Sequence, residues 1–146
     1  MGPLEGVRIL DLSMLVSGPF SAMMLGDLGA DVIKIEPPEG NVIRNIPGPT
    51  RGDVPIGIIN WNRNKCAMVL DLKQPGVNEV FLRMAANADV VVQNVRPGVV
   101  DRLGVGYEAV AARNPKIVYC SIAGYGFSGP MRARPPTIQS SRDGPA

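Results

Sequence analysis

The sequence predicts an α/β fold with a doubly wound, mostly parallel sheet of about five strands. Residues 6–37, GVRILDLSMLVSGPFSAMMLGDLGADVIKIEP, follow the pattern of a strand, a helix and a second strand, which is a βαβ unit. A second observation is the almost purely apolar run Asp89–Val92, because such strands belong to parallel sheets that are buried on both faces. The length of 146 residues suits a single domain.

Five short apolar segments are predicted as strands, and polar residues follow most of them. In right-handed βαβ units the carboxyl ends of the strands share one edge of the sheet, where ligands bind. The pattern does not indicate the order of the strands. The predicted strands are residues 7–11, 31–35, 67–71, 89–93 and 117–121.

The helix of the first βαβ unit has signals at both ends. Ser17 is a candidate N-cap, Pro19 occupies an early helical position, and Gly29 lies where a left-handed C-terminal residue belongs. The apolar residues at helical spacing are Phe20, Met23, Met24 and Leu28.

Further helices are predicted between the later strands. Pro75 opens a helix, and residues 99–103 and 107–113 form short ones. Prolines and glycines crowd into residues 37–57 and 124–146, so both stretches are predicted as loops. Residues 61–65, WNRNK, are predicted as a polar, basic turn.

Composition excludes several classes of function. A net charge of +2 is too small to favour nucleic acid, and the sequence has no histidine and no metal-ligand cluster. No apolar run has membrane-spanning length and no signal pattern opens the chain, so a soluble, cytoplasmic protein is expected. Cys66 and Cys120 are then predicted to be buried free thiols.

Polar residues follow the predicted strand ends and indicate a binding site for an anion. Those just beyond the strands are Ser13, Ser17, Glu36, Asn94 and Arg96. Guanidinium and ammonium groups suit a phosphate-bearing ligand, although each such charge taken singly is more often a solvated surface residue. The further basic residues assigned to this edge are Arg44, Arg63, Lys65, Lys73 and Arg102.

An NAD-dependent dehydrogenase is a weaker alternative. Glu36, at the end of the second strand, could hold a ribose hydroxyl as in dinucleotide-binding folds. Those folds have a glycine-rich turn after the first strand, whereas the turn here, DLSMLVSGP, has one glycine.

Three motifs carry a resemblance to a known family: LDLK, NVRPGVVDRLGVGYE and CSIAGYGFSGP, in this order. Together with residues 6–40 they resemble the N-terminal part of the class III CoA-transferases, which include carnitine and formate CoA-transferases and 2-methylacyl-CoA racemases. The resemblance implies a Rossmann-like large domain, incomplete here. It also implies an interlocked homodimer, and CoA transfer between an acyl-CoA and a small carboxylic acid through an aspartyl intermediate, without a metal.

The resemblance also implies which residues contact CoA. Residues 15–17 match the segment along the thiol arm, the LDLK motif contacts the nucleotide, and residues 94–96 form a loop around the arm. Arg102 matches an arginine at the phosphates. The implied CoA-binding residues are Leu15, Val16, Ser17, Leu70, Lys73, Asn94, Val95, Arg96 and Arg102.

Two departures from the family pattern concern function. Pro37 stands where some members have an arginine, and residues 134–139, RPPTIQ, lack the aspartate of the family motif R-P-x-Y-D-P-x-x-Q. No catalytic residue is therefore assigned. Residues 1–130 are expected to be the N-terminal part of the large domain and residues 131–146 an irregular, divergent tail. We expect a truncated, inactive chain; the alternative is a catalytically dead CoA-binding, nucleotide-binding or interaction domain.

Overall fold

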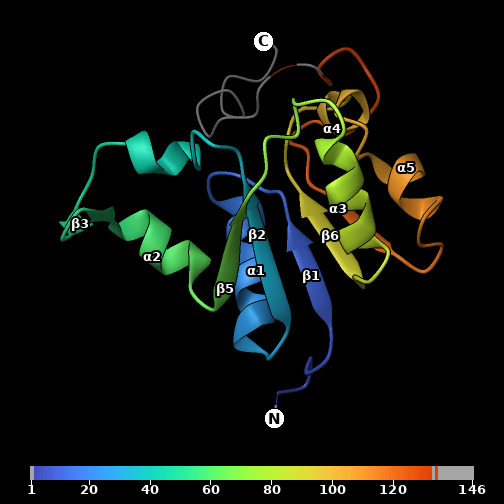
Figure 1. Cartoon of the computed structure of the whole chain (residues 1–146). Helices are drawn as coiled ribbons and strands as arrows, with labels where there is room; N and C mark the ends of the chain where they lie inside the picture. The colour runs from blue at the N-terminus through green and yellow to red at the C-terminus, as the bar shows by residue number, and fades with distance from the viewer. Residues whose placement is uncertain (1, 133, 135–146) are drawn as a thin grey trace.

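The computed structural model describes residues 2–132 and 134, and its centre is a five-stranded parallel sheet (Figure 1). The predicted α/β class is confirmed, and each predicted strand is present within two residues of its expected start. The strand order across the sheet is β5-β2-β1-β6-β7. The strands are β1 (Arg8–Asp11), β2 (Asp31–Glu36), β5 (Lys65–Val69), β6 (Val90–Gln93) and β7 (Val118–Ser121).

The strand order places a topological switch point in the middle of the sheet. From β1 the chain moves outward to β2 and then β5, and it returns to build β6 and β7 on the other side. Leu10 of β1 lies opposite both Ile33 and Val91 in the register. The loops that follow β1 and β6 therefore leave the sheet in opposite directions. The crevice between two such loops is the place where open α/β sheets bind ligands.

Helices cover both faces of the sheet. The helix α1 (Ser17–Asp27) covers one face, and α2 (Ile56–Asn62) packs against α1 at the side of the sheet. The opposite face is covered by α3 (Val77–Ala85), α4 (Val99–Arg102) and α5 (Tyr107–Ala111). Figure 1 shows α1 behind the sheet and α3 in front of it.

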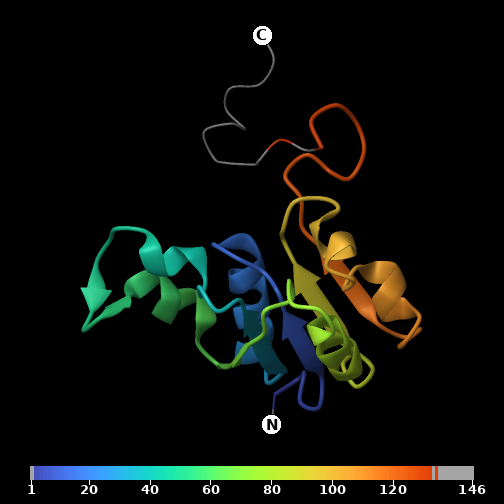
Figure 2. The ribbon, with the colours of Figure 1, turned by 45° about the horizontal axis from the view of Figure 1, so that its top comes forward.

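Residues 37–62 are more ordered than the sequence predicts. They form the 3-10 helix η1 (Val42–Asn45), a hairpin of β3 (Thr50–Arg51) and β4 (Val54–Pro55), and α2. Figure 2 shows this segment extending sideways from the sheet, beyond β5. The expected polar turn over residues 61–65 is shorter in the structure: it covers residues 63–64, because Trp61 and Asn62 belong to α2 and Lys65 already begins β5.

The first helix begins where it was predicted, but by a different mechanism. Its N-cap residue is Val16, without a side-chain cap, so the predicted cap by Ser17 is wrong. Gly29 has φ 102°, as its predicted left-handed role requires. Of the apolar residues at helical spacing only Met23 is buried, whereas the others form an exposed stripe: Phe20, Met24 and Leu28.

The two cysteines are free thiols, but the prediction that they are buried is wrong. Cys66 lies on β5 and Cys120 on β7, and both are exposed. These strands are the two edges of the sheet, so neighbouring elements cover them less completely than they cover the central strands. In residues 2–132 and 134, no helix combines the length and the apolar character that crossing a membrane would require.

Candidate functional site

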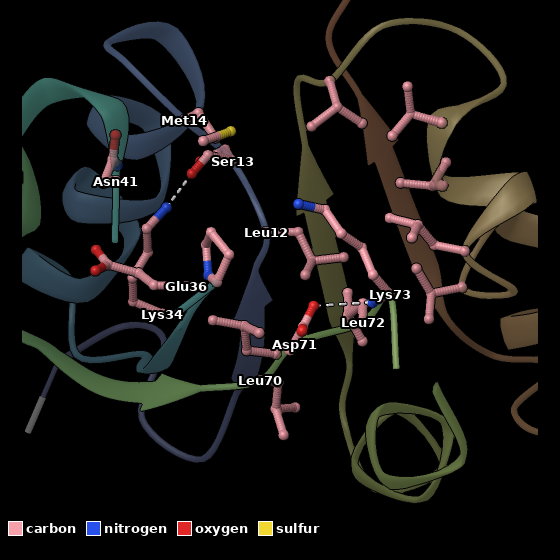
Figure 3. A pocket seen from close by; sticks show the side chains of 17 residues that line it. Leu12, Ser13, Met14, Lys34, Glu36, Asn41, Leu70, Asp71, Leu72 and Lys73 are labelled. Carbon is pink, nitrogen blue, oxygen red and sulfur yellow. Dashed lines mark hydrogen bonds between the residues drawn. The ribbon is translucent and has the colours of Figure 1, made fainter. Parts of the chain in front are cut away.

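A cavity of about 260 Å³ opens at the carboxyl edge of the sheet, near the switch point (Figure 3). The loops that follow β1, β2, β5 and β6 meet α4 around it. Most of its lining is apolar, which suits an organic ligand with a flat or aliphatic part. The apolar lining residues are Leu12, Met14, Ile35, Pro37, Leu70, Leu72, Val95, Val99, Val100, Leu103 and Val105.

Polar groups line two separate parts of this cavity. Lys34, Glu36 and Asn41 lie together on the side of β2, whereas Lys73 reaches in from the loop after β5 (Figure 3). The carboxylate of Glu36 accepts a hydrogen bond of 3.1 Å from Arg44. The ammonium of Lys73 is exposed and lies 3.4 Å from the carboxylate of Glu39. Exposed ion pairs of this kind are weak, so Lys73 can turn toward an anionic ligand.

The turn that carries Lys73 is held by Asp71. One carboxylate oxygen of Asp71 accepts the backbone N–H of Lys73 at 3.1 Å, and the other accepts the side-chain amide of Gln74 at 3.0 Å. These bonds form an Asx-type turn directly after β5. The backbone of Lys73 is thereby fixed while its long side chain stays free to reorient.

A buried charge network lies below the cavity, on the α1 face of the sheet. Asp11 ends β1, and its carboxylate lies 2.9 Å from the ammonium of Lys65 and 3.4 Å from that of Lys34. All three side chains are 3% exposed or less. The ammonium of Lys65 also donates to the carbonyl of Pro19 at 2.8 Å and to the side chain of Asn62 at 3.3 Å.

Burial and charge act in opposite directions in this network. Burial alone would raise the pKa of Asp11, but the charges of Lys34 and Lys65 hold this pKa below its ordinary value. Burial lowers the pKa of Lys34 and of Lys65, and the carboxylate of Asp11 opposes that effect. The loop after β1 is bound to the same network. The backbone N–H and the hydroxyl of Ser13 donate to the carboxylate of Asp11, and the backbone carbonyl of Ser13 accepts from the ammonium of Lys34.

A second set of bonds fixes the same loop across the switch point. The side-chain amide of Asn94, after β6, accepts from the N–H of Met14 and donates to its carbonyl, both at 2.7 Å. The same amide donates to the hydroxyl of Ser17 at 3.2 Å. Leu15, which lies between Met14 and Ser17 in the chain, has φ 61°, a value that strains a non-glycine residue. The loop over residues 13–17 is thus held in one conformation by the protein itself.

Gly18 is required by this tight loop. A Cβ atom at Gly18 would lie 2.2 Å from the Cβ of Ser13, which no packing can accommodate. The glycine before Pro19 therefore permits the close approach of α1 to the loop.

Seven of the nine predicted CoA-contact residues line one of three hollows. Leu70, Lys73 and Val95 line the main cavity. Leu15 and Val16 line a second hollow together with Trp61. Asn94 and Arg96 line a small cleft beside Tyr125, together with Val95. The other two predicted residues, Ser17 and Arg102, line none of these hollows.

Two of the basic residues assigned to this edge from the sequence lie elsewhere. Arg63 precedes β5 and pairs with Asp27 near the end of α1, at 2.5 and 3.2 Å, so it belongs to the amino edge of the sheet. Lys65 is the first residue of β5, and its ammonium is committed to Asp11. The error was to assign these residues to the carboxyl edge, because residues that precede or begin a strand of a parallel sheet lie at its amino edge.

Sequence reasoning missed Asp11, Lys34 and Asn41. Strand β2 alternates, with Val32 and Lys34 on the face toward α1 and Ile33 and Ile35 on the other. In a parallel sheet buried on both faces, a lysine within a strand must have a buried partner, and this signal could have identified the network. Asn41 follows a Gly40 turn and precedes an apolar residue, which is the pattern of a capping residue.

The chain matches the family model described as CoA-transferase family III over residues 4–139. It is 43% identical over 134 residues to an acetyl-CoA:oxalate CoA-transferase of Acetobacter aceti. The matched residues are 92% of this chain and 34% of the relative. It is 44% identical over 133 residues to the human succinyl-CoA:glutarate CoA-transferase, covering 90% of this chain and 30% of the relative.

Solved structures agree with the fold. Rv3272 from Mycobacterium tuberculosis superimposes with a TM-score of 0.86 at 36% identity, covering 98% of this chain and 41% of that chain. A CAIB/BAIF family protein from Brucella suis gives 0.85 at 37% identity, with 91% and 36% covered. The chain spans about a third of the length of the curated relatives that it matches.

Proposed function

Because the chain belongs to CoA-transferase family III, we propose that the cavity at the carboxyl edge of the sheet binds the CoA part of an acyl-CoA. The observation that carries this proposal is the combination of an apolar cavity with Lys73 at its side. An apolar lining accepts the base and the aliphatic parts of CoA, and the ammonium can pair with a phosphate. Leu70 and Val95 would contact the organic part.

We assign the other predicted contact residues to the same ligand. Asn94 fixes the loop that carries Leu15, Val16 and Ser17, so its role would be to position that loop along the thiol arm. Arg96 and Arg102 would contribute charge around the phosphates, because guanidinium groups form paired hydrogen bonds with phosphate oxygens.

For the whole protein we propose transfer of CoA between an acyl-CoA and a small carboxylic acid through an aspartyl intermediate, in a homodimer. The two exposed free thiols support a reducing compartment, so we place the protein in the cytoplasm. The 146-residue chain by itself would bind CoA without completing the transfer, because its sequence has no aspartate at the family motif. That motif, and the tail from residue 131, lie largely outside the described residues.

Calorimetric titration of CoA into the chain and its variants tests the binding site. We expect Lys73→Ala and Arg102→Ala to lower the affinity about tenfold or more each, because hydrogen bonds to charged groups contribute about 1.5–3 kcal/mol. Lys116→Ala and Arg83→Ala are matched controls, since both residues are exposed and lie away from the cavity. Absence of CoA binding, or equal losses in the control variants, would contradict the assignment.

Chromatography of CoA esters tests the catalytic part of the proposal. Acyl-CoA and carboxylate pairs incubated with the chain should show no exchange, since a carboxylate nucleophile is needed to attack the thioester. Turnover that disappears on Glu36→Gln or Asp143→Asn would show that another carboxylate replaces the family aspartate.

A further inference from the structure

The side-chain amide of Asn41 is an unused hydrogen-bond donor in the wall of the cavity. Asn41 is 1% exposed, and its Nδ2 atom has no hydrogen-bond partner. Within residues 2–132 and 134 it is the one buried side-chain nitrogen or oxygen left in this state. Buried donors are almost always paired, so an unpaired one beside a cavity points to a partner that arrives from outside.

The other polar atoms of Asn41 establish which way its amide faces. Its Oδ1 accepts the N–H of Ile43 at 3.2 Å and so caps η1, and its carbonyl accepts the N–H of Arg44 at 2.9 Å. Because Oδ1 is bound to a backbone donor, the oxygen and nitrogen of the amide cannot be exchanged without losing the cap. The nitrogen is therefore the one polar atom of this lining residue's side chain that is left without a partner.

The position of Asn41 indicates which part of a ligand it would meet. Lys73, the cation suited to phosphate, comes from the loop after β5, whereas Asn41 lies with Lys34 and Glu36 on the side of β2 (Figure 3). Apolar residues such as Leu70, Val100 and Leu103 complete the cavity. The carboxylate of Glu36 on this side would repel a phosphate, so an acceptor that meets Asn41 belongs to an uncharged part of the ligand.

We propose that Asn41 is a specificity-determining residue whose Nδ2 donates a hydrogen bond to an acceptor atom of the adenosine part of CoA. This inference rests on the proposed function and adds to it the residue that reads the buried end of the ligand. Adenosine offers ring nitrogens and ribose oxygens as acceptors. Binding would satisfy a donor that the free protein leaves unpaired, and so favours ligands that carry an acceptor at that place.

Asn41→Ser tests the inference while keeping the cap. A serine hydroxyl can still accept the N–H of Ile43, but the amide in the cavity is gone. We expect the affinities for CoA and for adenosine 3′,5′-bisphosphate to fall about three- to tenfold, the ordinary effect of losing one neutral hydrogen bond. The affinity for pantetheine should stay unchanged. Urea unfolding without ligand should show no loss of stability, because the removed donor had no partner.

Asn41→Asp and Asn45→Ser complete the experiment. Asn41→Asp keeps the cap and places an acceptor where the donor was, so its loss should exceed that of Asn41→Ser and persist at high salt, unlike a screened charge effect. Asn45→Ser changes an exposed asparagine of η1 and should bind like the wild type.

The outcomes separate this inference from the proposed function. Wild-type affinity in Asn41→Ser would overturn the role of Asn41 and leave CoA binding intact. An equal loss for pantetheine, together with reduced stability in urea, would show a structural role and also overturn it. If the wild-type chain binds neither CoA nor the bisphosphate, the proposed function fails and this inference fails with it.

Discussion

The two faces of the sheet use the same strands for different purposes. On the face covered by α3, α4 and α5, the strands contribute mainly apolar side chains, among them Leu10, Ile35 and Val91, and no buried charge network like that of Asp11 is found there among the described residues. On the α1 face the apolar residues stop halfway, and Asp11 and Lys34 continue the strands toward the carboxyl edge. One face supplies an apolar core, whereas the other combines a smaller core with the charges that hold the binding loop. The alternation of the strands thus places the charge network on one face, while the apolar core of the other face also supplies part of the cavity lining.

A pair of phenylalanine substitutions should show the contrast most strongly. Phe81 is fully buried on the α3 face, and Phe20 is half-exposed on α1. Phe81→Ala should lower the free energy of unfolding by about 3–5 kcal/mol through the cavity that it leaves. Phe20→Ala should change it by about 0.5 kcal/mol or less, as surface substitutions do. Urea unfolding measures both, and equal losses would mean that the α1 face is as well packed as the other.

Asp11→Asn should be the most damaging change on the α1 face. The substitution keeps the shape of the side chain but leaves Lys34 and Lys65 buried without an opposite charge. Breaking a buried ion pair in this way costs about 3–5 kcal/mol. Ser13 also loses its charged acceptor, so the loop over residues 13–17 should become mobile. Amide hydrogen exchange of Met14 and Ser17 would show faster exchange, and unchanged protection would contradict a positioning role for Asp11.

The acid sensitivity of the fold should come partly from the same carboxylate. The pKa of Asp11 in the folded chain lies below its ordinary 3.8, so the folded state holds its proton less tightly than the unfolded state. The stability that Asp11 contributes is complete above pH 3.8 and is lost as the pH falls through the lowered value, by at most about 1.4 kcal/mol per pH unit. Unfolding curves of wild type and Asp11→Asn should converge in this acid range. Parallel pH profiles would contradict the assignment.

Much of the fold was predictable because strands and helices repeat with simple periods. The five strands follow from apolar runs, and Gly29 from its place after a helix. The segment over residues 37–62 was not predictable, because its order comes from the Asn41 cap and from α2 packing against α1, neither of which has a sustained period.

The candidate site was predictable in part. Lys73 and Val95 were assigned from motifs, and both line the cavity. Asn41 was not predicted, because whether a side-chain amide has a hydrogen-bond partner depends on the folded structure and cannot be recognised from the neighbouring residues. Lys65 was misplaced because it was assigned to the carboxyl edge although it lies at the beginning of its strand, and only the structure shows that its side chain is bound to Asp11.

The smallest expected effect on stability, and the clearest on association, concerns the exposed stripe of α1. Phe20, Met24 and Leu28 follow one another at intervals of four residues and are each about half-exposed. Apolar stripes of this kind on a helix promote association, because contact removes their surface from water. We therefore expect the chain to self-associate as its concentration rises. Size-exclusion chromatography with light scattering should show a mass that increases with concentration.

A double variant, Phe20→Ser with Met24→Ser, should return the mass toward that of a monomer while leaving the urea midpoint nearly unchanged. The control is Phe127→Ser, which removes an exposed aromatic residue outside the stripe and should associate like the wild type. A wild-type chain that stays a monodisperse monomer at all concentrations would contradict the prediction. It would also mean that the α1 face, although its helix is only half-buried, needs no further covering, and the contrast between the two faces would then be one of charge alone.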